Sequence, residues 1–309
     1  MKFKVGKFFT RAPEPSTEPK HEIIISSNCQ IGGLSAALKC IFPNRDIGVR
    51  LFPNADNLDA VKKFRNALQS ARVWITSDRL ELRGELPIEV IRIPDLNFRA
   101  FHPDMREAMN VTTNSLTTPT NNSQIAVWAY NNQISKPAAA RLFNRGVFKS
   151  LGYLDCWSHS VDALRTRFAN QGITTEEFER FFLRIKRMGQ FMYTFNHPRI
   201  EALIELARIV ARRLGADSEL AEREIVVPDA LTYALWPLYP EVGEELGLRG
   251  SYHWRFSTSL TLFDLHGIDA YLDFAYRSYE DQGIRPTGVQ CRSPTPNLDQ
   301  ILRQHLECR

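Results

Sequence analysis

The sequence lacks the short motifs by which many nucleotide, hydrolytic and metal enzymes are recognised. It contains neither a Gly-x-x-x-x-Gly-Lys phosphate loop nor a Gly-x-Gly-x-x-Gly dinucleotide fingerprint. The Gly-x-Ser-x-Gly nucleophile elbow is also missing. No Cys-x-x-Cys pair and no His-Glu-x-x-His segment occurs. The sequence therefore gives no support for a zinc site, and we expect no metal.

Cysteine is scarce, and long apolar runs are missing. The five cysteines, at positions 29, 40, 156, 291 and 308, are scattered and odd in number, unlike those of a disulfide framework. We therefore expect reduced thiols and a cytoplasmic location. No stretch approaches the roughly 20 apolar residues that a membrane-spanning helix needs, so no transmembrane segment is predicted.

Positive charge is not arranged in a way that indicates a nucleic-acid partner. The formal net charge is +4, and residues 1–20 supply +3 of it, because they hold five Lys or Arg against two Glu. The rest of the chain is close to neutral and has no basic stripe interleaved with aromatic residues. Prolines among the charges predict a flexible tail over residues 1–20, without the apolar stretch of a secretory signal.

The first part of the chain alternates between short apolar runs and amphipathic segments. Strands are predicted over Glu22–Ile25, Ile47–Phe52, Val73–Thr76 and Ile88–Ile93, with helices near 34–42 and 57–70 between them. This alternation favours a parallel sheet covered by helices. We predict an α/β fold in which residues 21–309 form one domain, with a strand-rich half over 21–109.

The second part of the chain is dominated by helix signals. Helices are predicted over 135–149, 158–170, 174–190, 199–214 and 268–280, so residues 124–309 should form a mainly helical half. The clearest is 199–214, whose apolar residues recur on one face between Pro198 and Gly215. Between the halves, 11 of the 14 residues over 110–123 are Asn, Thr or Ser, which predicts a polar surface loop.

The turn after the first predicted strand contains a candidate reactive group. The run Ile23–Ile25 is followed at once by small and polar residues and then by an amphipathic helix. This order places Cys29 near a helix N-terminus, whose free N–H groups lower the pKa of a thiol. Asn28 and Gln30 flank it, and such amides are costly to bury without a partner. Binding clefts form at the carboxyl ends of parallel strands, which is where this turn would lie. The alternative is that Cys29 is a small core residue, as a lone cysteine commonly is.

Two His-Pro dipeptides supply candidate bases. Each histidine precedes a proline, which confines it to an extended backbone: His102 lies in Phe-His-Pro-Asp and His197 in Asn-His-Pro. The helix after His197 would keep that imidazole neutral near pH 7, as a general base requires. Asp104 could orient a neighbouring imidazole as a triad carboxylate does. Each histidine could instead be a satisfied core or capping residue.

These motifs occur together in one family. Asn28-Cys29-Gln30, the segment from Phe101 to Asp104, Asn196-His197-Pro198 and the run Trp236–Pro240 follow one another in the same order. Over roughly residues 22 to 280 the chain resembles the WcbI-type polysaccharide-biosynthesis enzymes, which are regarded as acetyltransferases. The proline-rich tail and the Asn/Thr-rich insertion after the His-Pro-Asp segment depart from that pattern.

The resemblance implies an enzyme that binds coenzyme A. Acetyl-CoA would be the donor, and a sugar hydroxyl of capsular or surface polysaccharide would be the acceptor. The site would lie in a cleft between the two halves, lined by Cys29, Gln30, His102, Asp104, Asn196 and His197. Gln30, Asn28 or main-chain N–H groups of the turn could hold the oxyanion, and Arg50 and Arg199 are the candidates for the CoA phosphates. The sequence does not indicate the oligomeric state.

Two chemical routes and three other functions stay open. Cys29 could attack the thioester and carry the acetyl group, or a histidine could activate the acceptor hydroxyl while Cys29 only lines the site. An esterase of the SGNH type, with cysteine in place of serine, is an alternative, although the Gly-Asp-Ser motif is missing. A second alternative is a non-catalytic protein that binds CoA or glycan. A third is a sulfotransferase, because recognition of adenosine phosphates overlaps with recognition of CoA.

Overall fold

A four-stranded parallel sheet forms the amino-terminal part. The computed structural model describes residues 21–53, 56–77, 88–257 and 261–307; the predicted tail and Cys308 lie outside these ranges. The strands lie in the order β2-β1-β3-β4, which confirms the predicted parallel sheet. Their bounds are Ile23–Ser26 for β1, Ile47–Val49 for β2, Val73–Thr76 for β3 and Glu89–Arg92 for β4.

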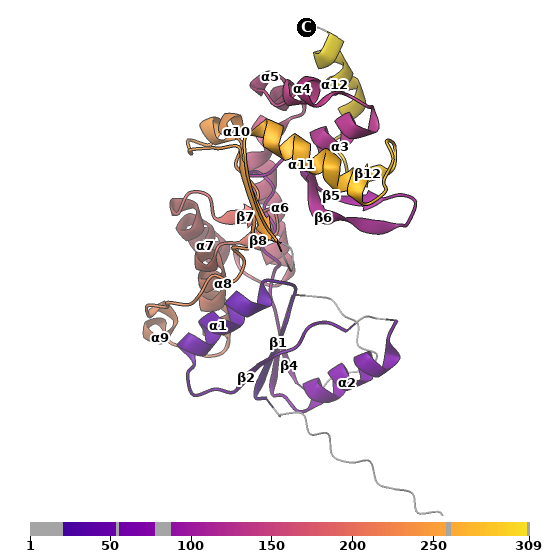
Figure 1. Cartoon of the computed structure of the whole chain (residues 1–309). Helices are drawn as coiled ribbons and strands as arrows, with labels where there is room; N and C mark the ends of the chain where they lie inside the picture. The colour runs from indigo at the N-terminus through magenta and orange to yellow at the C-terminus, as the bar shows by residue number, and fades with distance from the viewer. Residues whose placement is uncertain (1–20, 54–55, 78–87, 258–260, 308–309) are drawn as a thin grey trace, which may run out of the picture.

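Helices cover both faces of this sheet because successive strand residues point to opposite sides. Ile23 and Ile25 join the core shared with α1 (Ile31–Ile41). Ile24 and Trp74 face the other way and pack with α2 (Leu58–Gln69). Figure 1 shows the two helices on either side of the sheet. The strand order reverses between β1 and β3, and clefts in open α/β sheets form at such a switch point.

The segment predicted as a polar loop is a β-hairpin, so that prediction was wrong. Strand β5 (Met105–Asn110) pairs with β6 (Ser115–Ser123), and β12 (Val289–Cys291) adds a third antiparallel strand. The polar side chains bind one another: Asn122 Nδ2 donates to Thr117 Oγ1, and Tyr279 donates to Asn122 Oδ1. Internal hydrogen bonds thus let an Asn- and Thr-rich strand be partly buried.

The rest of the chain is mainly helical, as predicted. The expected helix over 135–149 is interrupted and forms two short helices, whereas α3, α9, α10 and α12 were not predicted. A single turn of 3₁₀ helix, η1, precedes α6. The helices are α3 (Gln124–Asn131), α4 (Lys136–Ala140), α5 (Arg145–Ser150), η1 (Tyr153–Asp155), α6 (Cys156–Asn170), α7 (Thr175–Arg187), α8 (Ile200–Arg213), α9 (Ser218–Glu222), α10 (Pro240–Glu245), α11 (Ile268–Asp281) and α12 (Leu298–Glu307).

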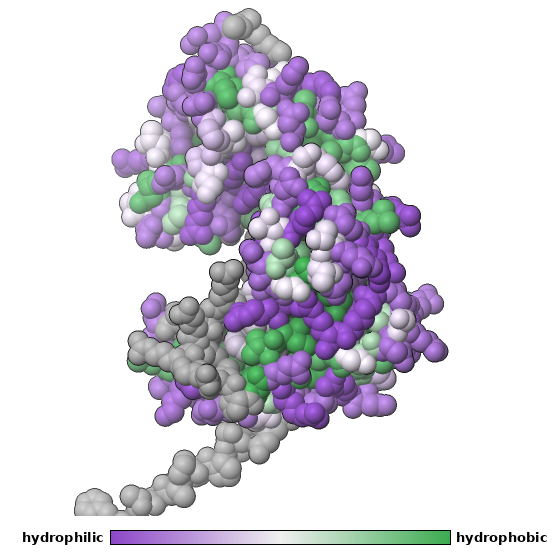
Figure 2. Space-filling view, turned by 180° about the vertical axis from the view of Figure 1, so that it is seen from behind, coloured by the Kyte–Doolittle hydropathy of each residue, from purple (hydrophilic) through white to green (hydrophobic). Residues whose placement is uncertain are grey.

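Two small antiparallel sheets lie between the parallel sheet and the helices at the carboxyl end (Figure 1). One pairs β7 (Met192–Thr194) with β8 (His197–Pro198). The other has the order β11-β10-β9, with bounds Ala234–Leu235 for β9, His253–Ser257 for β10 and Leu262–His266 for β11. Seen from behind, the surface is notched between the upper and lower parts of the molecule (Figure 2). Within the described ranges, no helix combines the length and apolar character needed to cross a bilayer.

Close packing of α1 on α8 joins the two parts. Gly33 of α1 faces α8 so closely that an added Cβ would lie 2.6 Å from Leu203 Cδ1 and 2.9 Å from Ile200 Cδ1. Helix α1 begins just after Cys29, and α8 begins just after His197 and Pro198. The contact near the first turns of both helices therefore brings the segment that carries Cys29 close to the segment that carries His197.

Enlarging Gly33 should weaken this contact. We expect Gly33→Leu to lower the free energy of unfolding by about 1–3 kcal/mol, because the added atoms overpack the α1–α8 contact. Gly32→Leu is the matched control, since a Cβ at Gly32 meets nothing within 4 Å. Urea unfolding measures both variants. Equal stability of the two variants would contradict the assigned packing.

Candidate functional site

The turn between β1 and α1 is fixed by the side chain of Gln30. This residue is buried, and its Nε2 donates to the carbonyl oxygens of Leu96 at 2.8 Å and Asn196 at 3.0 Å. Its Oε1 accepts from the Leu96 N–H at 3.1 Å. One amide therefore joins the turn after β1, the segment after β4 and the turn before α8. Both N–H groups of the amide are used internally, so Gln30 positions the site and has none left for a ligand.

Asn28 completes the turn on its open side. Its Oδ1 accepts from the Gln30 N–H at 2.9 Å, and its Nδ2 donates to Asp95 at 3.0 Å. Asp95 follows β4, so both residues lie at the carboxyl edge of the parallel sheet. Cys29, between Asn28 and Gln30, is exposed.

The thiol of Cys29 is not activated in this setting. Although the residue as a whole is exposed, surrounding protein atoms desolvate its sulfur and raise the pKa of the thiol above the ordinary value, and the nearby carboxylate of Asp95 raises it further. The sequence instead predicted a lowered pKa from the N-terminus of α1. A hydrogen bond from the main-chain N–H of Cys29 does lower the pKa of the thiol, but desolvation raises it by more. The thiol form therefore dominates at neutral pH.

A second turn carries Asn196 and His197, and Thr194 holds it in place. Thr194 Oγ1 accepts from the His197 N–H at 3.1 Å and donates to Asn196 Oδ1 at 2.9 Å. The amide oxygen of Asn196 is thereby occupied, which fixes the orientation of the side chain. Its NH₂ group donates to no other residue in the part of the chain that the structure describes, and Asn196 lines the cavities defined below.

His197 is paired with Tyr233. The imidazole Nε2 lies 3.1 Å from the phenolic oxygen. His197 is only 8% exposed whereas Tyr233 is 44% exposed, so the phenol is the part of the pair that meets solvent. Burial lowers the pKa of His197. The imidazole is therefore neutral at neutral pH, as predicted, but desolvation rather than the helix dipole is the cause.

Tyr233 also lies near the thiol of Cys29. Burial raises the pKa of the Tyr233 phenol, and a thiolate at Cys29 would raise it further. The phenol therefore stays protonated at neutral pH and can donate to the imidazole. The structure thus brings Cys29, Tyr233 and His197 to one place.

Two adjoining cavities share Asn196 and Glu107, and we call them together the cleft. The first has a volume of about 340 Å³ and is lined by the segments that Gln30 joins: Asn28, Gln30, Asp95, Leu96, Asn97, Arg99, Glu107, Phe195 and Asn196. The second, of about 470 Å³, contains His197 and Tyr233. Thr118, Pro119, Thr120 and Asn121 of the β5–β6 hairpin form part of its wall. The cleft thus extends from the carboxyl edge of the parallel sheet to the hairpin.

Arg99 is a cation of the cleft wall. Its guanidinium stacks on Phe195, with 4.2 Å to the ring centroid, and donates to the Met105 carbonyl at 3.3 Å. Among the described residues no carboxylate forms an ion pair with it. Burial lowers its pKa most, the charges of Arg106 and Arg167 lower it further, and the carboxylate of Glu107 acts in the opposite sense. A bound anion would favour the charged guanidinium in the same way as Glu107 does.

The two arginines predicted from the sequence lie elsewhere. Arg199 stacks on Tyr193 with 5.0 Å to the ring centroid, and Arg50 follows β2. Neither side chain lines either cavity of the cleft.

His102 is buried away from the cleft lining. It is 1% exposed, and Gln190 Nε2 donates to its Nε2 at 3.2 Å. Burial lowers its pKa to about 3, so it is neutral over the physiological range. His102 and His197 therefore do not share one set of contacts, and only His197 lines the cleft.

Asp104 does not orient an imidazole, contrary to the sequence-based interpretation. It is fully buried and accepts hydrogen bonds from Tyr153 at 3.0 Å and Tyr239 at 2.9 Å. The Ile125 N–H at the start of α3 donates to it as well, at 3.3 Å. Asp104 thus ties three helical segments together beneath the site. Burial raises the pKa of its carboxyl group.

Several residues of the cleft were not predicted from the sequence. Thr194, Asp95, Glu107, Arg99 and Tyr233 stand outside the His-Pro and Cys motifs. Tyr233 meets His197 across 36 positions of the chain, so local sequence carries no signal for the pair. Arg99 and Thr194 each lie three residues before the histidine of a His-Pro motif, so proximity to a motif could have indicated both.

Replacing Asp104 should affect stability in a pH-dependent manner. We expect Asp104→Ala to cost about 3–5 kcal/mol, because two phenols and one N–H lose a buried acceptor. The raised pKa means that above pH 3.8 the folded state holds this proton more tightly than the unfolded state. Wild-type stability should therefore fall as the pH rises through the folded-state pKa, a slope that Asp104→Asn lacks.

Urea unfolding of wild type and Asp104→Asn between about pH 4 and pH 8 measures this slope. A difference between the two proteins that does not change with pH would contradict the raised pKa.

Comparison with known proteins identifies the family. The family described as polysaccharide biosynthesis enzyme WcbI matches residues 22–219, more than half of the chain. A solved structure of WcbI, described as a novel polysaccharide biosynthesis enzyme in its native form without a disulfide bond between coenzyme A and one of its cysteines, has the same fold. It is 16% identical, with a TM-score of 0.63 over 94% of this chain and 99% of the other. No curated protein matches. The chain belongs to the WcbI family of polysaccharide biosynthesis enzymes.

Proposed function

We propose that this protein is a CoA-dependent O-acetyltransferase that moves the acetyl group of acetyl-CoA to a sugar hydroxyl. The pairing of a neutral, buried His197 with the exposed phenol of Tyr233 in the cleft carries the proposal. A hydroxyl acceptor needs a base that is neutral at working pH, and His197 meets that requirement. The family membership supports polysaccharide as the source of the hydroxyl, and the WcbI structure associates coenzyme A with a cysteine of that protein.

In the proposed mechanism Tyr233 relays a proton to His197. The acceptor hydroxyl binds at the Tyr233 oxygen and attacks the thioester carbon. As its oxygen–carbon bond forms, its proton passes to Tyr233 while the phenolic proton moves to His197 Nε2. The carbon–sulfur bond then breaks, and the proton leaves His197 through Tyr233 to the CoA thiolate. Tyr233 acts as a relay rather than as the base, because its raised pKa opposes a phenolate.

Asn196 is the proposed oxyanion donor. Its Oδ1 is held by Thr194, and its NH₂ group is available on the cleft wall next to His197. A positioned amide N–H stabilises the negative charge that develops on the thioester oxygen, and one such donor is typically worth about 3–4 kcal/mol.

Arg99 is the proposed contact for a CoA phosphate. It lines the smaller of the two cavities, which leaves the larger cavity, with His197 and Tyr233, for the transfer step. A guanidinium that forms no ion pair with a carboxylate of the described residues can bind phosphate in a bidentate geometry. Asn28 lines the same cavity and is proposed to contact the cofactor as well.

The β5–β6 hairpin is the proposed acceptor-side wall. Thr118, Thr120 and Asn121 offer hydroxyl and amide groups to the cavity that holds Tyr233. Sugars are bound by such hydrogen-bonding groups together with aromatic faces, and Phe256 lines the same cavity. The acceptor therefore lies between the hairpin and the proton relay.

Cys29 is proposed to line the donor site without carrying the acetyl group. Its pKa is raised, and its one side-chain partner among the described residues is Asn28 Oδ1 at 4.0 Å, which is not a base. A cysteine nucleophile needs a low pKa or an adjacent base. Direct transfer is therefore the better supported of the two routes.

Removing the proton relay should slow turnover. We expect His197→Gln to lower kcat by about 10²–10⁴-fold, and Tyr233→Phe to lower it with little change in the KM for acetyl-CoA. Tyr276→Phe is the matched control, because its hydroxyl donates only to the Ile134 carbonyl. The assay follows release of the CoA thiol in the presence of a panel of saccharides.

Full activity of both relay variants would refute the mechanism. Release of acetate from acetylated glycans without CoA would instead support the esterase alternative.

Replacing Cys29 separates the two routes. We expect Cys29→Ala to retain most of the transferase activity, and wild type exposed to acetyl-CoA to gain no stable mass on Cys29. Intact-mass spectrometry with peptide mapping measures the second outcome, with Cys40→Ala as the matched control. An acetyl group found on Cys29, together with loss of activity in Cys29→Ala, would establish the covalent route instead.

A further inference from the structure

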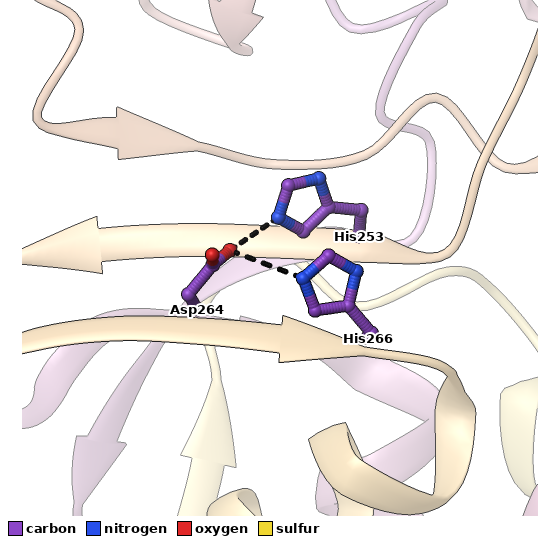
Figure 3. Close-up of side chains that lie close together, drawn as sticks. All are labelled: His253, Asp264 and His266. Atoms are coloured by element: carbon purple, nitrogen blue, oxygen red, sulfur yellow. Dashed lines mark hydrogen bonds and ion pairs between the residues drawn. The ribbon is translucent and has the colours of Figure 1, made fainter.

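Three possible metal ligands meet on the sheet formed by β9, β10 and β11. His253 lies on β10, and Asp264 and His266 lie on β11 (Figure 3). The donor atoms of all three side chains lie within 4.8 Å of one another. None of these residues belongs to the lining of the cleft or contributes to the proposed mechanism.

The strand register explains why these side chains share one face. His253 is the direct cross-strand partner of His266, and Asp264 lies two residues before His266 on the same strand. Side chains two residues apart on a strand, and those of cross-strand partners, point to the same side of a sheet. The alternate residue Trp254 points into the core, where it is fully buried.

The ring nitrogens converge on one carboxylate. His253 Nε2 contacts Asp264 Oδ1, and His266 Nε2 lies 3.6 Å from the same oxygen. The two imidazole rings stack with centroids 4.1 Å apart and an interplanar angle of 14°. Figure 3 shows both Nε2 atoms turned toward Asp264. Donor atoms around a tetrahedral zinc ion are ~3.4 Å apart, given bonds of about 2.0–2.1 Å, so small side-chain rotations would suffice.

The charge of Asp264 is directed to the histidines rather than to its cross-strand neighbour. Arg255 is the residue opposite Asp264 in the ladder, yet the two form no ion pair in the described structure. A cation bound between the rings would accept one lone pair from each imidazole and one from the carboxylate.

The backbone beneath the three ligands is firmly held. Trp254, next to His253, stacks on Tyr271 of α11 with centroids 4.3 Å apart. The Gly267 N–H, just after His266, donates to the Tyr252 carbonyl at 2.7 Å and closes the end of the hairpin. The ligands are thus mounted on a rigid scaffold, which precise metal geometry requires.

We propose that His253, Asp264 and His266 bind a zinc ion, with the fourth position left to water. Two imidazoles and one carboxylate suit zinc, whereas calcium and magnesium prefer oxygen ligands alone. The ion would clamp β10 to β11 at the end opposite Phe256 and Ser257, which line the cleft. It would thereby stiffen one wall of the cleft without touching the reacting groups.

This site differs from the expectation of no metal drawn from the sequence. The ligands are divided between two strands, ten residues lie between His253 and Asp264, and only Asp-x-His is local. Asp264 and His266 can be recognised as part of a ligand set only when the register of β11 with β10 is known, because that register places His253 beside them.

Titration of the untagged full chain with ZnCl₂ after removal of metal tests the proposal. Isothermal calorimetry should give one zinc per chain in wild type, and His266→Ala, His253→Ala and Asp264→Asn should each weaken binding by at least about tenfold. His159→Ala, an exposed histidine on α6, is the matched control and should bind zinc as wild type does. Zinc should also raise the Tm of wild type but not that of His266→Ala.

Two further measurements keep the outcome clear. Equal Tm values of wild type and the three variants in EDTA would establish that the variants fold. Cobalt substitution should give a visible spectrum without a thiolate-to-metal charge-transfer band, because no cysteine belongs to the site. Zinc affinity unchanged in all three variants, a thiolate band, or no binding at about 100 μM zinc would overturn the proposal.

Discussion

The arrangement of the candidate site depends on the buried amide of Gln30. Its three hydrogen bonds to Leu96 and Asn196 connect segments that are 66 and 166 residues away along the chain. Each bond contributes about 1 kcal/mol net, but an unsatisfied amide at this depth would cost more than a bond gains. The three segments therefore have to be in place together for the amide to be buried. The close contact of Gly33 with α8 also holds these segments together, because it brings the first turns of α1 and α8 against each other.

The degree of burial distinguishes the titratable groups that hold the fold together from those that could take part in a reaction. Asp104 and His102 lie in the interior, where the carboxyl group joins two tyrosines to α3 and the imidazole is held by Gln190. Desolvation also keeps His197 neutral, but Tyr233 connects this imidazole to solvent. The same physical effect thus makes one histidine inaccessible and gives the other the protonation state that a base needs.

How well each part of the structure could be predicted depends on how far apart in the sequence its interacting residues lie. Strands β1 to β4 and the long helices were predicted to within three residues at each end, because alternation and helical periodicity are local patterns. The largest error in a strand is in β2, which ends at Val49 and not at Phe52. The β5–β6 hairpin was predicted as a loop, since its polar residues are satisfied by one another and by Tyr279, which lies far along the chain. The same limit applies to the site. The turns that carry Cys29 and His197 were predicted, whereas the pairing of His197 with Tyr233, the internal bonds of Gln30 and the true partners of Asp104 depend on tertiary contacts.

The central claim is that the cleft between Gln30 and the β5–β6 hairpin binds the donor acetyl-CoA, with Arg99 on a phosphate. Calorimetric titration of CoA into wild type and Arg99→Ala tests it most directly, with Arg199→Ala as the control outside the cleft. The account predicts one CoA per chain in wild type, binding weakened at least about tenfold in Arg99→Ala, and binding unchanged in Arg199→Ala. Absence of any heat of binding with CoA or acetyl-CoA, or equal affinity in wild type and Arg99→Ala, would contradict it.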